Sequence, residues 1–137
     1  MNITSSRSVN TFTNCNYQSL DFAVTTSCQL TISKSFAESI KVNATSSHVL
    51  LDYVKGDISL VATSGTLYIS GVGENYDSAS TEYNSYLKES NLIIENNGAS
   101  CKTDIIDCDL NKLSITQDGG FIKFKQSKII DGYINGT

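Results

Sequence analysis

Proline is absent from this 137-residue chain. An average chain of the same length would contain about seven prolines. A continuous β-ladder uses every backbone N–H, and proline has none, so the absence fits a chain of paired strands. An AT-rich genome, in which proline codons are scarce, would give the same absence. The high use of Asn, Ile, Lys, Ser and Tyr favours the second explanation, and both can hold.

Long apolar runs are also absent. No segment is long enough for a membrane-spanning helix or for the hydrophobic region of a signal peptide. We therefore expect no membrane partner, and a protein that stays in the cytoplasm or is assembled there into a virion. Lys and Arg total 10 against 14 Asp and Glu, which gives a net charge of −4. Because phosphate binding needs a basic face, this charge argues against a nucleic-acid partner.

The residue patterns of catalytic and calcium sites are lacking. His48 is the single histidine, and only Ser47 and Asp52 lie near it in sequence, whereas a catalytic histidine needs a partner that the fold brings to it. The three acidic residues at 104, 107 and 109 show neither of the known calcium-loop spacings. We interpret them as a solvated corner. We predict no catalytic residue, no cofactor and no metal ligand.

The four cysteines, Cys15, Cys28, Cys101 and Cys108, lack the C-x-x-C spacing typical of zinc sites. Cys28 lies two residues before Leu30, and Cys108 two residues after Ile106, so both continue an apolar alternation. We therefore interpret the cysteines as reduced structural thiols. Disulfides and a metal site are the less favoured alternatives.

A nine-residue repeat is the strongest pattern present. From Ile40 to Asn75 the chain divides into IKVNATSSH, VLLDYVKGD, ISLVATSGT and LYISGVGEN. The first and third positions are apolar in every block, which predicts a short strand with one buried face, followed by a polar corner. Glycine stands third in the corners VKGD and TSGT, where we expect positive φ. The predicted inward residues are Val42, Leu51, Leu60 and Ile69, and the outward residues are Lys41, Asp52, Ser59 and Tyr68.

Similar alternation begins near Leu20 and Leu30 and resumes from Leu92 to Ile134, so we predict one all-β domain over residues 1–137. Two architectures fit. In a β-solenoid the nine-residue units stack in parallel, whereas in a β-sandwich or meander each corner is a hairpin. A period held at nine over four units favours the solenoid, and the number of units per turn stays open.

The segment KGDISLVATSGTLYISGV carries a resemblance to a known family. Its Gly56-Asp57-Ile58 and Ser64-Gly65-Thr66-Leu67 are similar to the repeats of bacterial putative-adhesin domains, the GD-rich β-solenoid family. The resemblance covers about a quarter of the chain. It implies a solenoid fold and, less directly, a surface-adhesin role.

The repeat stops in a polar excursion at residues 73–91. Tyr83, Tyr86 and Leu87 have helical spacing, which predicts a short helix or an ordered excursion that protrudes from one side of the stack. Tyrosine supplies contact area at a small entropic cost, as in the binding loops of antibodies. The alternative is that the rings hold the excursion on the flank. The candidate binding residues are Tyr76, Tyr83, Tyr86 and Asn84.

The last strands alternate Phe121 and Phe124 with Lys123, Lys125 and Lys128. Such alternation occurs in single-strand nucleic-acid platforms, but in an acidic chain we interpret it as an exposed strand guarded by lysine. A solenoid leaves unpaired backbone groups at its ends, so we predict a homo-oligomer with the C-terminal strands, the excursion, or both in the contact.

Taken together, these features predict a non-enzymatic structural or recognition module with protein partners. It would be a component of a larger assembly such as a phage or virus particle, a fibre or a surface adhesin. The alternative is a small acidic protein inhibitor of the phage anti-defence type, which acts by binding another protein.

Overall fold

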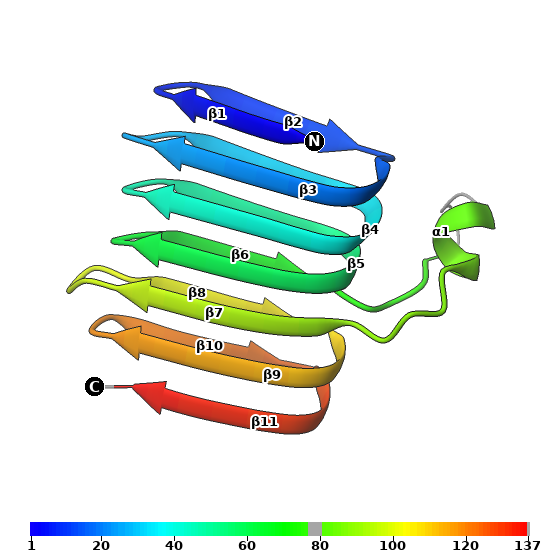
Figure 1. Ribbon diagram of the computed structural model, residues 1–137. Helices are drawn as coiled ribbons and strands as arrows, with labels where there is room; N and C mark the ends of the chain where they lie inside the picture. The colour runs from blue at the N-terminus through cyan, green and yellow to red at the C-terminus, as the bar shows by residue number, and fades with distance from the viewer. Residues whose placement is uncertain (77–80, 137) are drawn as a thin grey trace.

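The computed structural model describes residues 1–76 and 81–136, and they form a β-solenoid of about 7 turns (Figure 1). The one helix in these residues is α1, Thr81–Ser85. The strands are β1 (Asn2–Ser6), β2 (Val9–Thr13), β3 (Asn16–Thr25), β4 (Gln29–Thr45), β5 (His48–Thr63), β6 (Thr66–Ser70), β7 (Asn91–Asn97), β8 (Lys102–Ile106), β9 (Asp109–Asp118), β10 (Phe121–Lys125) and β11 (Lys128–Gly136).

Each turn of the solenoid contributes one strand segment to each of two faces. Face A contains β2, the first parts of β4 and β5, and then β6, β8 and β10. Face B contains β1, β3, the second parts of β4 and β5, and then β7, β9 and β11. All of these pairings are parallel, which confirms the predicted solenoid and excludes the hairpins of a meander.

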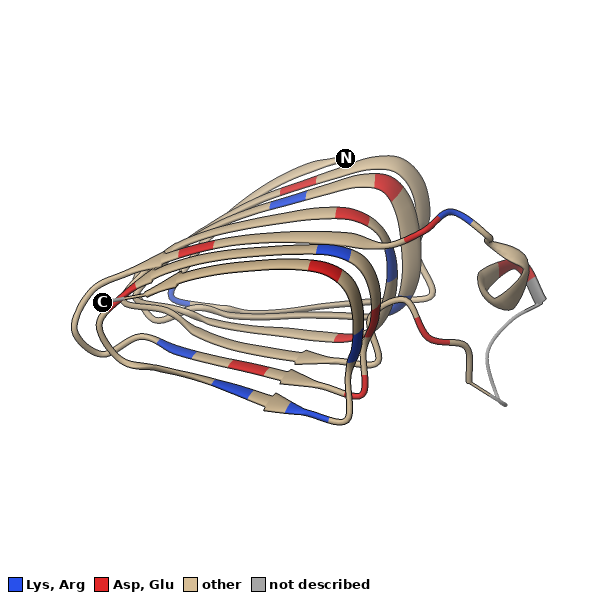
Figure 2. Cartoon of the chain, turned by 90° about the horizontal axis from the view of Figure 1, so that it is seen from below, with Lys and Arg blue, Asp and Glu red and all other residues tan. Residues whose placement is uncertain are grey.

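In cross-section the turns form a wedge (Figure 2). The two faces meet at a narrow edge, where the chain turns within about two residues, as at Ser46 and Ser47. At the other end they are separated by a short third side, the wide flank. The flank consists of residues 34–38 in one turn and 53–56 in the next, and β4 and β5 run through it without interruption.

Two nine-residue units make one turn. Lys41 pairs with Ser59, and Leu50 pairs with Tyr68, so in both cases the chain reaches the equivalent position of the next turn after 18 residues. The turn from Asp21 to Lys41 takes 20 residues instead. This longer turn explains why the alternating segments before Ile40 begin ten residues apart rather than nine.

The side chains predicted to point inward form the core. Val42, Leu51, Leu60 and Ile69 are all fully buried, and each stacks on the equivalent residue of the turns beside it. Of the residues predicted to point outward, Lys41 and Tyr68 are exposed, while Asp52 and Ser59 are half-buried on the outer surface. The predicted register is therefore confirmed.

The corners are stacked as regularly as the strands. One column at the start of the wide flank has positive φ in six successive turns, at Asn14, Lys34, Tyr53, Gly71, Asp107 and Gln126. Gly56 has the predicted positive φ of 132°, and a Cβ there would lie 1.9 Å from the carbonyl oxygen of Ala37.

The prediction of positive φ at Gly65 was wrong, because Ser64 takes that conformation instead, with a φ of 53°. Gly65 is needed for space. A Cβ at this position would lie 2.9 Å from the Cβ of Ala62 across the narrow edge.

The four cysteines are free thiols that occupy corner positions, where other turns have serine. The backbone N–H of Cys15 donates to Ser35 Oγ in the next turn, and that of Cys28 donates to Ser47 Oγ. Ser35 Oγ and Ser47 Oγ each donate to the carbonyl oxygen two residues earlier, at 2.7 Å in both cases. The thiols thus stand in for small hydroxyl side chains inside the corners.

We expect Leu51→Ala and Leu60→Ala each to lower the free energy of unfolding by about 2–5 kcal/mol, because each leaves a cavity between stacked turns. Ser59→Ala, between them on the outer surface, should change it by less than about 0.5 kcal/mol. Urea denaturation followed by circular dichroism measures all three. Equal and small effects at the three positions would contradict the register.

The thiols should differ in reactivity. Cys15 is half-buried while the other three are buried, and burial raises the pKa of the Cys108 thiol to about 11, which leaves little reactive thiolate. We expect a thiol reagent to label one cysteine in the native protein and all four in urea, as counted by mass spectrometry. A mass loss matching a disulfide, or bound zinc in a native spectrum, would contradict the structural role.

Candidate functional site

The excursion between β6 and β7 leaves the solenoid at the wide flank and returns to it, carrying α1 on the outside (Figure 1). The short helix was predicted and is present, although it spans only Thr81–Ser85. Residues 77–80 of the predicted excursion lie outside the described residues. The part that is described packs closely on the flank.

Aromatic rings form the contact between the excursion and the flank. The ring of Tyr86 lies 4.7 Å from that of Phe36, and the ring of Tyr76 lies 4.6 Å from that of Tyr53, measured between centroids. Tyr83 lies between them and is only 1% exposed. Its burial raises its pKa above the ordinary tyrosine value. Most of the aromatic surface of the excursion is therefore in contact with the chain itself.

Lys55 is the polar centre of this contact. Lys55 lies on the outward side of the flank, but the excursion covers it, so only 4% of the residue is exposed. Its Nζ donates to the carbonyl oxygens of Tyr83 at 3.1 Å and Tyr86 at 3.2 Å, and to Asn75 Oδ1. The ammonium also lies 4.7 Å from the centre of the Tyr83 ring. Burial lowers the pKa of Lys55, and the charge of Glu74 opposes that shift.

The four predicted binding residues are thus brought together, and the hydrogen bonds described for them here are within the chain. Asn84 donates to the carbonyl oxygen of Tyr76, the Tyr83 hydroxyl to that of Glu74, and the Tyr86 hydroxyl to that of Ala37. These contacts hold the excursion on the flank, which is the alternative role considered for these residues from the sequence. Binding of a partner by the same residues stays a prediction.

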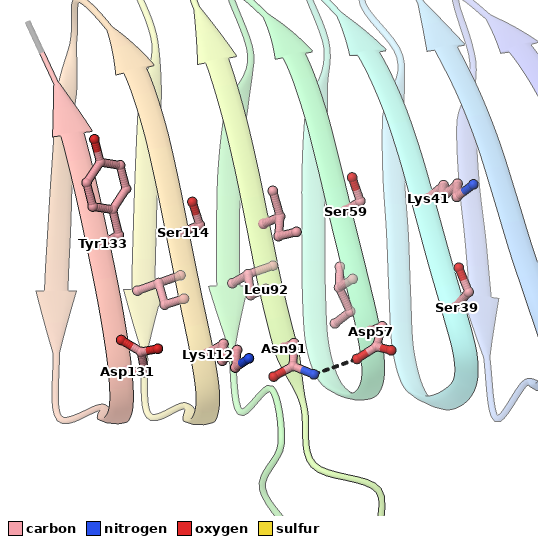
Figure 3. Close-up of a pocket in the computed structure, with 13 residues that line it drawn as sticks. Ser39, Lys41, Asp57, Ser59, Asn91, Leu92, Lys112, Ser114, Asp131 and Tyr133 are labelled. Atoms are coloured by element: carbon pink, nitrogen blue, oxygen red, sulfur yellow. Dashed lines mark hydrogen bonds between the residues drawn. The ribbon is translucent and has the colours of Figure 1, made fainter.

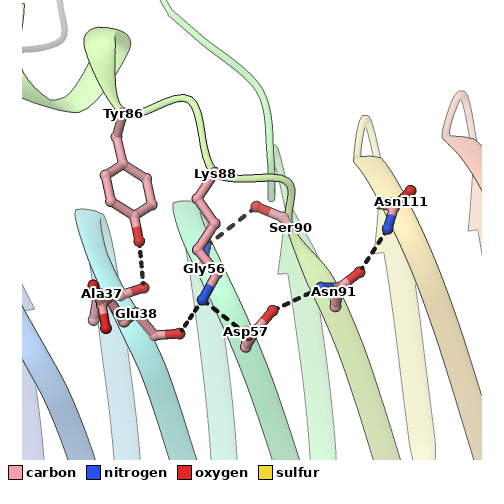
Figure 4. Close-up of polar contacts among 9 residues, drawn as sticks. All are labelled: Ala37, Glu38, Gly56, Asp57, Tyr86, Lys88, Ser90, Asn91 and Asn111. Carbon is pink, nitrogen blue, oxygen red and sulfur yellow. Dashed lines mark hydrogen bonds and ion pairs between the residues drawn. The ribbon is translucent and has the colours of Figure 1, made fainter.

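A second anchor holds the point where the excursion rejoins the solenoid (Figure 4). Lys88 Nζ lies 2.9 Å from Asp57 Oδ2, and Asn91 donates to Asp57 Oδ1 at 2.7 Å. Asn111 in the next turn donates to Asn91, so Asp57, Asn91 and Asn111 form a hydrogen-bonded ladder across turns. Burial of Asp57 would raise its pKa, but the hydrogen bonds from Asn91 and Lys88 hold it below the ordinary value.

A shallow hollow of about 510 Å³ runs across the outer surface of face B (Figure 3). Two columns of its lining come from successive turns, and the one nearer the flank carries charges of both signs. Polar and charged side chains border an apolar floor that includes Ile93. The first column is Lys41, Ser59, Ile93, Ser114 and Tyr133, and the second is Ser39, Asp57, Asn91, Lys112 and Asp131.

The C-terminal rung, defined as β10 and β11, is the most exposed apolar part of the solenoid. Its strands pair with β8 and β9 on one side, and no other described strand pairs with them. Phe124 and Ile134 occupy inward positions but are 39% and 49% exposed. In the preceding turn, Ile105 and Ile115 occupy the same columns and are both 0% exposed. The rung therefore has apolar residues at core positions that are exposed among the described residues.

The N-terminal rung, defined as β1 and β2, has a different character. Its inward positions near the narrow edge are polar, and they are hydrogen-bonded to one another. Asn10 donates to Ser5 Oγ at 2.9 Å and to Ser8 Oγ at 3.1 Å. Ile3 and Phe12 are half-buried against the core. This end is partly capped by its own side chains, whereas the C-terminal end is not.

The other groups singled out in the sequence are not brought together. His48 is exposed on face A between Gln29 and Thr66, whereas the Ser47 hydroxyl is turned inward to the carbonyl oxygen of Thr45. Asp109 lies 3.9 Å from Lys128 across a turn. Within residues 1–76 and 81–136, no group of three or more His, Cys, Asp or Glu side chains could hold a metal ion.

Comparison with protein-family models, with curated proteins and with solved structures found no match. Among the described residues, no helix has the length and apolar character needed to cross a membrane.

We expect Lys55→Met to lower the free energy of unfolding by about 2–3 kcal/mol, because three oxygen acceptors lose a charged donor while the apolar stem is kept. Lys112→Met, at an exposed position on face B, is the control and should change it by less than about 0.5 kcal/mol. Urea denaturation measures both.

Tyrosine ionisation gives an independent readout of the same change. The pKa of Tyr83 is higher in the folded state than in the unfolded state, so the docked ring stabilises the protein below a pH of about 10, and this stabilisation is lost as the pH rises further. Ultraviolet titration of the wild type should show part of the ionisation delayed to higher pH. Unchanged stability and an unchanged delay in Lys55→Met would contradict the anchoring role.

Proposed function

We propose that the protein is a non-enzymatic structural or recognition module of a larger assembly, such as a phage or virus particle, a fibre or a surface adhesin. The observation that carries this proposal is the C-terminal rung, where Phe124 and Ile134 stand in core columns but are largely exposed. A large apolar patch on a soluble protein is typically a contact surface.

Backbone chemistry supports the same conclusion. In a parallel solenoid the N–H and C=O groups point along the axis, toward the turns on either side. The last rung therefore presents a row of donors and acceptors beside its apolar side chains. Edge strands of this kind pair with further strands unless they are blocked. Lys123, Lys125 and Lys128 surround the rung, but none of them covers its open end.

The rest of the molecule fits a scaffold better than a catalyst. The ring contacts and hydrogen bonds of Tyr76, Tyr83 and Tyr86 hold the excursion on the flank. His48 lies alone on an outer surface. A catalytic role would need a nucleophile, a base and an oxyanion donor within reach of each other. The alternative, a small acidic inhibitor, is supported by the net charge of −4 and needs no self-association.

Self-association through this rung is the first test. We expect multi-angle light scattering and sedimentation to show a mass that rises above the monomer between micromolar and millimolar concentrations. Ile134→Asn should abolish the rise, because it places an amide in the open core column. Val9→Asn is the matched control, since Val9 is exposed on the N-terminal rung at the opposite end.

Circular dichroism and urea denaturation establish that both variants fold. If Ile134→Asn does not fold, Ile130→Asp serves instead, because Ile130 is exposed on the outer side of β11. A wild type that is strictly monomeric over this range would contradict the proposal and favour the inhibitor. Association that neither variant weakens would contradict the C-terminal rung as its carrier.

A further inference from the structure

We propose that the excursion is fastened to the wide flank by an intramolecular amide bond, formed between Lys55 Nζ and the side-chain carbonyl carbon of Asn75. The lysine lies in the part of β5 that runs through the flank, and the asparagine lies where the excursion leaves the solenoid. Three observations carry the inference: the closeness of the two groups, the contacts that hold them in place, and the chemical surroundings. It is independent of the assembly role, because neither residue belongs to the C-terminal rung.

The amine and the carboxamide are in direct contact. Lys55 Nζ lies 2.5 Å from Asn75 Oδ1. Because a C=O bond is about 1.2 Å long, Nζ is also within about 3.7 Å of Asn75 Cγ, the carbon that would be attacked. Reacting atoms held about 3–3.5 Å apart in a fixed orientation react far faster than the same groups free in solution. The two side chains are therefore close to a reactive geometry in the folded chain.

Hydrogen bonds hold the backbone on both sides of Asn75. On one side, the Tyr83 hydroxyl donates to the carbonyl oxygen of Glu74 at 2.9 Å. On the other side, Asn84 Nδ2 donates to the carbonyl oxygen of Tyr76 at 3.1 Å. The lysine belongs to β5, which passes through the flank without interruption. Both reacting groups are thus attached to backbone that is fixed before the reaction.

The surroundings of Lys55 favour the neutral amine, which is the nucleophilic form. The residue is 4% exposed, and its burial lowers its pKa. The ring of Tyr83 lies 4.7 Å from Nζ, and the rings of Phe36 and Tyr76 lie against that ring. The contacts of Nζ with the carbonyl oxygens of Tyr83 and Tyr86 orient it in the unreacted state. After the reaction, the one N–H that is left can keep one of these two contacts.

Glu74 is the candidate proton carrier. It directly precedes Asn75, and its charge acts on Lys55. All three residues line one hollow of about 380 Å³ beside the excursion. A carboxylate in this place can take a proton from the ammonium and later deliver it to the leaving group. Asn75 is exposed, so the ammonia that is released has a route to solvent.

The reaction is a transamidation that needs no further reactant. The ammonium of Lys55 gives a proton to the carboxylate of Glu74, and the neutral Nζ attacks Asn75 Cγ. The Nζ–Cγ bond forms, Nζ passes a second proton to Nδ2, and the Cγ–Nδ2 bond breaks. Nδ2 leaves as ammonia and takes up the proton held by Glu74. One ammonium and one carboxamide thus become one secondary amide and one free ammonium ion, without oxidation or reduction.

The bond gives a reason for a lysine at this place. An ammonium buried among rings and carbonyl groups costs free energy, whereas the amide that replaces it is neutral. The bond also closes a loop between residues 20 apart in sequence, which limits the unfolded chain as a disulfide does. Unlike a disulfide, an amide is not opened by thiols, so the excursion would stay fastened in reducing and oxidising surroundings alike.

The intact mass of the full chain is the first test. The bond expels ammonia, so we expect the denatured wild type to be about 17 Da lighter than its sequence. Asn75→Ala and Lys55→Arg should each have the full mass of their own sequences. Circular dichroism establishes that the variants fold, and the wild-type mass is decisive by itself if they do not.

Peptide mapping locates the bond. Chymotrypsin should release a branched peptide in which residues 54–60 are joined to residues 69–76, since it cuts after Tyr53, Leu60, Tyr68 and Tyr76. Fragmentation of this peptide by tandem mass spectrometry should place the junction at Lys55 and Asn75. A succinimide at either Asn-Gly sequence, 97–98 or 135–136, would give the same mass loss. It would leave a linear peptide, however, and it would persist in Asn75→Ala.

A time course after refolding tests the proton carrier. Glu74→Gln keeps the size of the side chain but cannot accept the proton, so the bond should form at least about tenfold more slowly than in the wild type. Glu89→Gln is the matched control, because Glu89 lines the same hollow and is exposed. We expect this control to react at the wild-type rate.

Contrary results are distinct. A wild type that keeps its full mass after prolonged incubation, or a mass loss found only in linear peptides, would overturn the amide bond and leave a simple hydrogen bond between the two side chains. Bond formation at an unchanged rate in Glu74→Gln would overturn the role of Glu74 alone. None of these results bears on self-association, so the proposed function stands or falls separately.

Discussion

The axial hydrogen-bond ladder is the constraint on which the rest of this structure depends. Every strand of the solenoid is paired in parallel, so the backbone groups of one turn are satisfied by the turns before and after it. This ladder explains why the inward positions must repeat in register, since a shift of one residue would expose the core. It also explains why a rung at the end is chemically incomplete in a way that no interior rung is.

The corners show how a narrow wedge keeps this ladder continuous. Small side chains that donate to a carbonyl oxygen two residues earlier occupy the inside of the bends, as Ser35, Ser47 and Cys108 do. Residues with positive φ stack beside them, and most of these are not glycine. Such conformations cost energy for residues other than glycine, so packing on both sides must hold them. The cysteines occupy the same corner positions as these serines, so their spacing follows the turns of the solenoid and matches no metal site.

The repeating part of the fold could be predicted because its period is local. Alternation at Ile40, Val42, Val49 and Leu51 identifies the buried face, and a constant length of nine favours stacked turns. The anchor of the excursion could not be predicted in this way. Lys55 binds carbonyl groups 28 and 31 residues away, and a lone lysine in a polar corner of the repeat gives no sign that it will be buried. The lining of the hollow on face B likewise depends on pairing across the excursion, as between Ser59 and Ile93.

The first and last rungs of the described solenoid differ in the polarity of their inward side chains. Ser5, Ser8 and Asn10 satisfy one another at the first rung, so water can cover that end at little cost. At the last rung, Phe124 and Ile134 stand where Ile105 and Ile115 are buried one turn earlier, so the end is built as an interior layer. The first rung thus ends in polar side chains that bond to one another, whereas the last rung keeps apolar side chains at core positions.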